Sequence, residues 1–198
     1  LFNVYISRYG NYIAAAESYS GSIYLFDREG SLLWRREIEG HPYSLSISSG
    51  GEYVAVGTVG DYSGVHLFDR AGALLLNYRT GKDVGSVSVS TSGDVAAGTY
   101  ENYLYYFEGS GMKWRRPMGG AVYATISAGG VATASGDGRI YLLDGKGDLK
   151  GSYKTGLWRD YLSRIASSAD GTLVAAGSHF SGNVYLLDTS KAPFLSPI

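Results

Sequence analysis

The pentapeptide Ile23-Tyr24-Leu25-Phe26-Asp27 occurs in five related versions along the 198 residues of the chain. Each version is rich in aliphatic and aromatic residues and closes with an acidic one; the other four are Val65–Asp69, Leu104–Glu108, Ile140–Asp144 and Val184–Asp188. Successive versions begin 42, 39, 36 and 44 residues apart. A recurrence at intervals near 40 residues indicates a tandem array of one supersecondary unit.

A second motif, made of small and β-branched residues, precedes every version of the pentapeptide. Its copies are Tyr12–Ala16, Tyr53–Thr58, Val95–Thr99, Val131–Gly136 and Leu173–Ser178. Chance does not explain two linked motifs that recur in the same order in five registers. The two motifs therefore belong to one repeated unit.

Each unit is predicted to form four short antiparallel strands. The first alternates polar and apolar residues, as in Tyr43–Ser48, which is the period of a half-buried strand. The second is the small-residue motif, whose short side chains let neighbouring sheets approach. The third is the pentapeptide, which is apolar on both faces and is therefore expected between two sheets. The fourth is charged, as in Leu32–Arg36, which suits an outermost strand with a solvated edge.

Four antiparallel strands repeated every ~40 residues are the sequence form of a β-propeller blade. We therefore expect an all-β fold, a β-propeller of five four-stranded blades. The blades are placed at about 1–40, 41–81, 82–120, 121–156 and 157–192, followed by a C-terminal tail at 193–198.

Ring closure is left open by the sequence. The last unit runs into Pro193 and Pro197, and proline is a poor residue for a central strand, so the fifth blade is expected to lack its fourth strand. The first unit starts directly at its first strand and offers no surplus strand in exchange. Either a five-bladed ring closes by blade contact alone, or the chain is a segment of a larger propeller.

These repeats resemble the quinoprotein-like and WD-like propeller families. The resemblance is clearest in Asp137–Asp144, and in Tyr24–Asp27 leading through Gly30 to Leu33-Trp34, and it extends over nearly the whole chain. It implies a propeller fold and says little about function, because such repeats occur in scaffolds, assembly factors and enzymes. No Trp-Asp dipeptide closes the third strand and the chain has no Cys, so no family cofactor residue is carried over and no cofactor is expected.

Composition excludes several classes of protein. With 17 Lys+Arg against 18 Asp+Glu and no Cys, the chain is neither a nucleic-acid binder by charge nor a disulfide scaffold. No apolar run has the ~20 residues of a membrane span, and the given chain shows no signal segment, so no compartment is assigned. The lack of Cys and Gln, with Arg in excess of Lys, suits a thermophile.

Candidate binding residues lie in the loops between the second and third strands and between successive blades, because these loops share one face of a propeller. They combine aromatic and hydrogen-bonding groups: Trp158, Arg159, Asp160, Tyr161, Tyr62, Tyr100, Tyr103, His41 and His179. The Trp158–Tyr161 segment is the leading candidate, because it is an insertion relative to the other units. The alternative for each tyrosine is that it merely caps the end of a sheet.

The remaining polar residues favour structural roles. The acid that closes each pentapeptide recurs in every unit, as expected of a turn cap and not of a catalytic group. His66 replaces the tyrosine of other units and is expected in the core. The acids outside the repeat form no recognisable catalytic pair; they are Glu17, Asp61, Asp83, Glu101 and Asp160. No metal site is predicted.

These observations favour a non-enzymatic β-propeller scaffold that binds a protein or peptide partner through one face of the ring. A carbohydrate-binding, lectin-like propeller with tyrosine-lined pockets is the alternative. An enzyme of glycosidase or quinoprotein type is a third hypothesis, which requires carboxylates that converge in the central channel.

Overall fold

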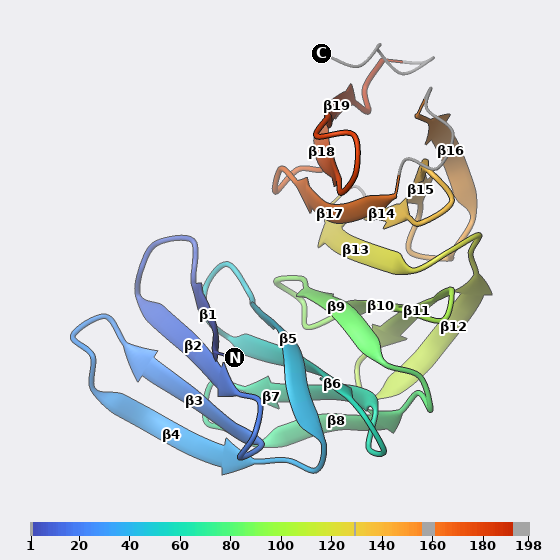
Figure 1. Ribbon diagram of the computed structural model, residues 1–198. Helices are drawn as coiled ribbons and strands as arrows, with labels where there is room; N and C mark the ends of the chain where they lie inside the picture. Colours follow the sequence, from blue (N-terminus) through green and yellow to red (C-terminus); the bar gives the residue numbers. More distant parts are fainter. Residues whose placement is uncertain (1, 129, 156–160, 192–198) are drawn as a thin grey trace.

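The computed structural model describes residues 2–128, 130–155 and 161–191, and strands are the only regular secondary structure in these ranges (Figure 1). The first two sheets contain β1 (Phe2–Ile6), β2 (Tyr12–Glu17), β3 (Ser22–Asp27) and β4 (Leu32–Glu37), then β5 (His41–Ile47), β6 (Tyr53–Val59), β7 (Gly64–Asp69) and β8 (Leu74–Arg79). The next two contain β9 (Val84–Val89), β10 (Val95–Thr99), β11 (Tyr103–Glu108) and β12 (Gly111–Pro117), then β13 (Val122–Ser127), β14 (Gly130–Ser135), β15 (Arg139–Leu143) and β16 (Leu149–Lys154). The fifth contains β17 (Leu162–Ser167), β18 (Leu173–Ser178) and β19 (Val184–Asp188).

Within each sheet every strand pairs antiparallel with the next strand in the chain. The first strand of each sheet, from β1 to β17, lies on the inner side of the arc that the five sheets form (Figure 1). This arrangement confirms the β-propeller prediction. The fifth sheet has three strands within the described residues, and the predicted tail at 193–198 lies outside them.

The core is divided among the four interfaces between neighbouring blades. In the first interface Ile23 and Leu25 of β3 pack against Val54, Val56 and Phe68 of the next blade. Three further clusters of the same kind lie between the second and third, third and fourth, and fourth and fifth blades. Each internal pentapeptide thus buries side chains on both faces, as its composition predicts.

The acid at the end of the third strand caps the following turn. Asp27 Oδ1 accepts hydrogen bonds from the backbone N–H of Glu29 at 3.1 Å and of Ser31 at 2.8 Å. Asp144 does the same at Lys146 and Asp148, and a side-chain bond from Lys150 helps hold the pKa of Asp144 at about 2. Asp69 and Asp188 also accept backbone bonds, whereas Glu108 pairs with Lys113. The turn-cap interpretation is confirmed for the four aspartates.

The described blades form an open arc. Neighbouring blades touch through their inner strands, β5 against β9, β9 against β13 and β13 against β17. No comparable contact joins the described part of the fifth sheet to the first, and the two stand apart in Figure 1. Contact between the first and fifth blades therefore does not close a ring in the described structure.

His66 is buried in the second blade, as predicted, with 5% of its surface exposed. Neither ring nitrogen has a hydrogen-bond partner. Burial lowers the pKa of His66 from 6.5 to about 4; nearby Arg79 also lowers it, and Glu39 opposes the change. The imidazole therefore stays neutral in the folded protein near pH 7.

Replacement of His66 by Phe tests whether burial lowers the pKa of this imidazole. Between pH 6.5 and 4 the unfolded chain binds more protons at this position than the folded one, so stability falls as the pH falls. Over that interval the effect amounts to about 3 kcal/mol. His66→Phe should remove that contribution, seen as a shallower loss of the free energy of unfolding in urea titrations at pH 7, 6, 5 and 4. Parallel pH profiles for the two proteins would contradict the assignment.

Candidate functional site

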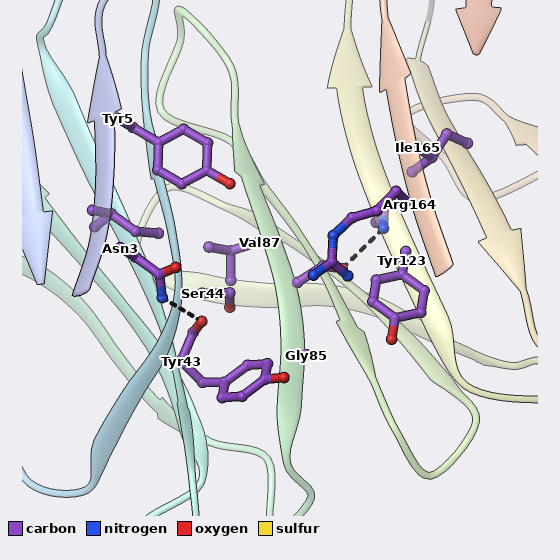
Figure 2. A pocket seen from close by; sticks show the side chains of 12 residues that line it. Asn3, Tyr5, Tyr43, Ser44, Gly85, Val87, Tyr123, Arg164 and Ile165 are labelled. Carbon is purple, nitrogen blue, oxygen red and sulfur yellow. Dashed lines mark hydrogen bonds between the residues drawn. The ribbon is translucent and has the colours of Figure 1, made fainter. Parts of the chain in front are cut away.

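The inner strands of all five blades line one cavity of about 180 Å³ (Figure 2). Asn3 and Tyr5 come from β1, Tyr43 from β5, Tyr123 from β13 and Arg164 from β17. Residues separated by more than 150 positions thus meet at the centre of the arc. A site built from one strand of every blade depends on correct packing of the whole array.

Polar residues of the inner strands join neighbouring blades along this channel. Asn3 Nδ2 donates to the Tyr43 carbonyl oxygen at 2.6 Å, and Ser86 Oγ accepts from the Ala124 N–H at 2.9 Å. Further bonds of this kind, such as that between Thr125 and Ser167, link the other blades. The polar positions of the predicted alternation therefore hold the channel wall together.

Six aromatic side chains form a run around one end of the channel, which we call the aromatic arc: Tyr43, Tyr100, Tyr123, Tyr161, His179 and Phe180. The ring of Tyr100 lies edge-on to Tyr43 at 5.8 Å and to Tyr123 at 6.3 Å between centroids. Tyr161 contacts the ring of His179 at 6.4 Å and that of Phe180 at 6.2 Å. The aromatic arc thus extends over the second to fifth blades.

Two glycines make room for rings of the aromatic arc. A Cβ atom at Gly85 would stand 2.9 Å from two ring carbons of Tyr100, and one at Gly136 would stand 2.9 Å from Tyr161 Cε2. The backbone also fixes the loops, since the Tyr100 N–H donates to the Asp83 carbonyl at 3.1 Å. The rings are therefore placed by contacts on several sides.

Tyr100 and Tyr161 of the aromatic arc are neutral hydrogen-bonding groups. Burial raises the pKa of Tyr100, and its hydrogen bond with Tyr43 raises it further. Burial, together with the side chain of Tyr123, raises the pKa of Tyr161. At physiological pH the phenols can donate or accept hydrogen bonds and carry no charge.

Arg164 supplies the one positive charge among the side chains that line the central cavity. Its guanidinium lies 5.4 Å from the centroid of the Tyr123 ring, and Nη1 donates to the Ser163 carbonyl at 2.7 Å. Within the described ranges no carboxylate forms an ion pair with it. Figure 2 shows it beside Tyr123. This end of the channel therefore combines neutral aromatic groups with Arg164, a cation that can form an ion pair with an acidic ligand.

The structure brings together three of the residues predicted from sequence. Tyr100, Tyr161 and His179 all belong to the aromatic arc. Trp158, Arg159 and Asp160 lie outside the described residues.

The other three predicted residues are not members of the aromatic arc. Tyr62 lies under the guanidinium of Arg79 at 4.4 Å, and Tyr103 lies under Arg115 at 5.4 Å. His41 contacts the Ser18 carbonyl through Nδ1 at 3.0 Å, and it lines a pocket between the first two blades together with Tyr43 of the aromatic arc.

Sequence reasoning did not single out Tyr123 and Arg164, which lie in the first strands of their blades. The only signal was that an aromatic and a cationic residue occupy a strand position where the first three blades carry Asn3, Ser44 and Ser86.

A second cavity of about 960 Å³ opens at the other end of the channel, among the turns between first and second strands. It is larger, and three of its four charged side chains are engaged locally; the fourth, Arg8, lies 5.7 Å from the centroid of the Tyr9 ring. Glu52 pairs with Arg70, Asp144 with Lys150, and Asp94 accepts a bond from Ser92. We therefore take the smaller cavity with its aromatic arc as the candidate site.

Carboxylates do not converge in the central channel of the described structure. Asp83 accepts bonds from the Gly60 N–H at 2.8 Å and Ser63 Oγ at 2.6 Å, and Glu17 accepts one from Ser20. No carboxylate is among the described residues that line the central cavity, and no cluster suited to a metal ion occurs among them. Among the described residues, the lining of this cavity therefore offers aromatic rings and one cation, and no pair of carboxylates.

Comparisons with known proteins show the fold. No protein-family model and no curated protein sequence matches the chain. Among solved structures, the β-propeller domain of Cps50 (Swd1) from Myceliophteria thermophila is similar with a TM-score of 0.76 and 14% identity. The match covers 98% of this chain and 69% of that one. The fold is a β-propeller. The likeness lends no support to the quinoprotein-like side of the resemblance.

The described residues contain no helix with the length and apolar character needed to cross a membrane.

Gly85→Ala tests how the aromatic arc is positioned. The added methyl should displace the Tyr100 ring and lower the free energy of unfolding by about 1–3 kcal/mol, as overpacking does. In a Tyr100→Ala background the same change should cost less than about 0.5 kcal/mol, because the clash is gone. Gly111→Ala is the control, since a Cβ there meets nothing within 4 Å. If Gly85→Ala lowered the free energy of unfolding equally in the Tyr100→Ala background, contact with the Tyr100 ring would not be the reason for a glycine at this position.

Proposed function

We propose that this propeller is a non-enzymatic module that binds a peptide segment of a protein partner. The binding site is the end of the channel that the aromatic arc and Arg164 form. The observation that supports this most is the run of six aromatic side chains around one end of the channel, next to a guanidinium without an ion-pair partner in the described structure. Aromatic and arginine side chains dominate the binding energy of protein interfaces.

The rigidity of the site favours peptide binding. Rings held by several contacts lose little conformational entropy when a ligand binds. Phe180 is 75% exposed and offers an apolar anchor at the edge of the aromatic arc. Arg164 would select peptides that carry a carboxylate at the matching position, because a guanidinium binds carboxylates in a two-pronged geometry.

The carbohydrate alternative has less support. The rings of Tyr43, Tyr100 and Tyr123 meet each other edge to face, at interplanar angles of 76° and 74°. Ring faces are thereby partly occupied within the aromatic arc and do not form a flat stacking platform. A glycosidase would need convergent carboxylates, and the described residues that line the central cavity include none.

The proposal is tested with peptides selected from a random phage-displayed library against the purified protein. Selected peptides should be enriched in acidic residues. Their affinity in calorimetry should fall at least about tenfold, or about 1.4 kcal/mol, on Phe180→Ala and on Arg164→Ala. Both side chains are exposed, so neither substitution should unfold the protein.

Tyr9→Ala is the matched control, since Tyr9 is 71% exposed but lines the cavity at the other end of the channel. It should leave affinity unchanged. Peptides that bind all three variants equally would overturn the assignment of the site.

A further inference from the structure

A pocket of about 250 Å³, which we call the inter-blade pocket, lies between the first two blades. Tyr19, Pro42, Tyr43 and Val59 supply its apolar wall, and Asn3 and His41 supply polar groups. No carboxylate, lysine or arginine is among the described residues that line it. The inter-blade pocket therefore suits an uncharged side chain, whereas the central cavity contains the Arg164 guanidinium.

The inter-blade pocket adjoins the candidate site. Asn3 and Tyr43 line both the inter-blade pocket and the central cavity. Asn3 Nδ2 donates to the Tyr43 carbonyl oxygen at 2.6 Å, as Figure 2 shows. This bond fixes the amide so that Oδ1 is left as an acceptor, and no donor among the described residues bonds to it. A ligand that occupies both cavities passes over Asn3, so the two cavities are neighbouring parts of one surface.

A β-bulge shapes the boundary between the two cavities. Pro42 and Ser44 of β5 pair with adjacent residues of β6, which leaves Tyr43 as the extra residue. A bulge bends its strand and redirects the side chain of the extra residue. The Tyr43 ring lies edge-on to the Tyr100 ring in the aromatic arc. The inter-blade pocket therefore begins at the residue where the aromatic arc ends.

His41 gives the inter-blade pocket a defined hydrogen-bond acceptor. Its Nδ1 lies 3.0 Å from the Ser18 carbonyl oxygen, which can only accept, so Nδ1 carries the hydrogen. In the neutral ring Nε2 is then an acceptor, and no described residue donates to it. The ring also lies close to Gly60, where a Cβ atom would stand 3.4 Å from Cδ2. Contacts on two sides therefore hold the ring in place.

The third blade shows that this acceptor is not a feature of the repeat. By strand register, Asp83 holds the repeat position of His41. The Asp83 carboxylate accepts bonds from the Gly60 N–H at 2.8 Å and from Ser63 Oγ at 2.6 Å. Asp83 is therefore engaged in joining two blades, whereas His41 has one ring nitrogen without a partner among the described residues.

We propose that the inter-blade pocket is a second subsite of the peptide site and takes a tryptophan side chain of the bound peptide. The inference rests on the proposed function and adds a second side chain to the acid that pairs with Arg164. An indole is apolar, with one N–H donor and no acceptor, which matches the apolar wall and His41 Nε2. The peptide backbone between the two side chains crosses Asn3 and donates an N–H to Oδ1.

The size of the inter-blade pocket agrees with a single side chain. Its volume of about 250 Å³ corresponds to about eight waters at about 30 Å³ each. That space holds one two-ring side chain and is too small for a folded segment. A helix or a strand of the partner therefore does not enter it.

The inter-blade pocket is first tested alone, with N-acetyl-L-tryptophanamide titrated into the isotopically labelled chain at pH 8. NMR should show saturable shifts at the His41 imidazole and at the Val59 methyl groups. The analogue with benzothiophene in place of indole has nearly the same shape and no N–H, so it should bind about fivefold more weakly. His41→Phe should abolish this preference, which a purely structural role of His41 would leave unchanged. Equal binding of the two probes to the unsubstituted chain would overturn the assignment of His41.

Peptides selected from the phage-displayed library provide the second test. They should carry a tryptophan at a fixed spacing from the acid, and its replacement by alanine should lower affinity at least about tenfold. Tyr19→Ala should weaken the tryptophan peptides by a similar factor and the alanine peptides by less than about twofold. Tyr19 is 86% exposed, so its loss should not unfold the protein. Tyr9→Ala, at the other end of the channel, is the control for both peptides.

The two proposals fail in different ways. Peptides that need Arg164 and Phe180 but show no tryptophan and no response to His41→Phe would overturn the second subsite and retain the peptide site. Saturable binding of the tryptophan probe at His41, with peptides indifferent to Arg164→Ala, would support the inter-blade pocket and overturn the peptide site at the aromatic arc.

Discussion

The structure depends on face-to-face contact between neighbouring sheets. Each interface places the large side chains of one third strand, such as Leu25, against the second and third strands of the next blade, such as Val54 and Phe68. Since a single four-stranded sheet has two apolar faces, no blade can bury its surface alone. The stability of the fold is therefore a property of the whole array, because each blade is stabilised by packing against its neighbours.

The same constraint creates the candidate site. Packing the blades brings one inner strand of each to a common axis, where Tyr43, Tyr123 and Arg164 meet although they are far apart in sequence. Hydrogen bonds from inner-strand polar groups such as Ser86 fix adjacent blades relative to one another. Recognition groups on such a wall are held in place before any ligand arrives, which reduces the entropy lost on binding.

The sequence alone was sufficient to predict the fold, because each strand and turn of a propeller blade is encoded by a short local motif. The pentapeptide, the small-residue strand and the turn-capping aspartates each encode one element, and all were recognisable without a structure. The site was only partly accessible, because Tyr100, Tyr161 and His179 lie in loops that a blade model already places on one face. Tyr123 and Arg164 escaped notice, because their role arises from the convergence of inner strands, which no single repeat displays. Tyr62 and Tyr103 lie in the same kind of loop, but each has a ring face against an arginine, Arg79 or Arg115, and neither joins the aromatic arc.

The hydrogen bonds that cross between inner strands have a mechanical consequence. Thr125 and Ser167 join the fourth and fifth blades, and Asn3 joins the first to the second, so every blade but the terminal ones is tethered on two sides. Moving any one of the second to fourth blades must therefore break inner-strand hydrogen bonds on both of its sides, so these bonds resist sliding of one blade past the next. Tyr100 belongs to the third blade, so the middle of the aromatic arc is attached to a blade that is braced from both sides.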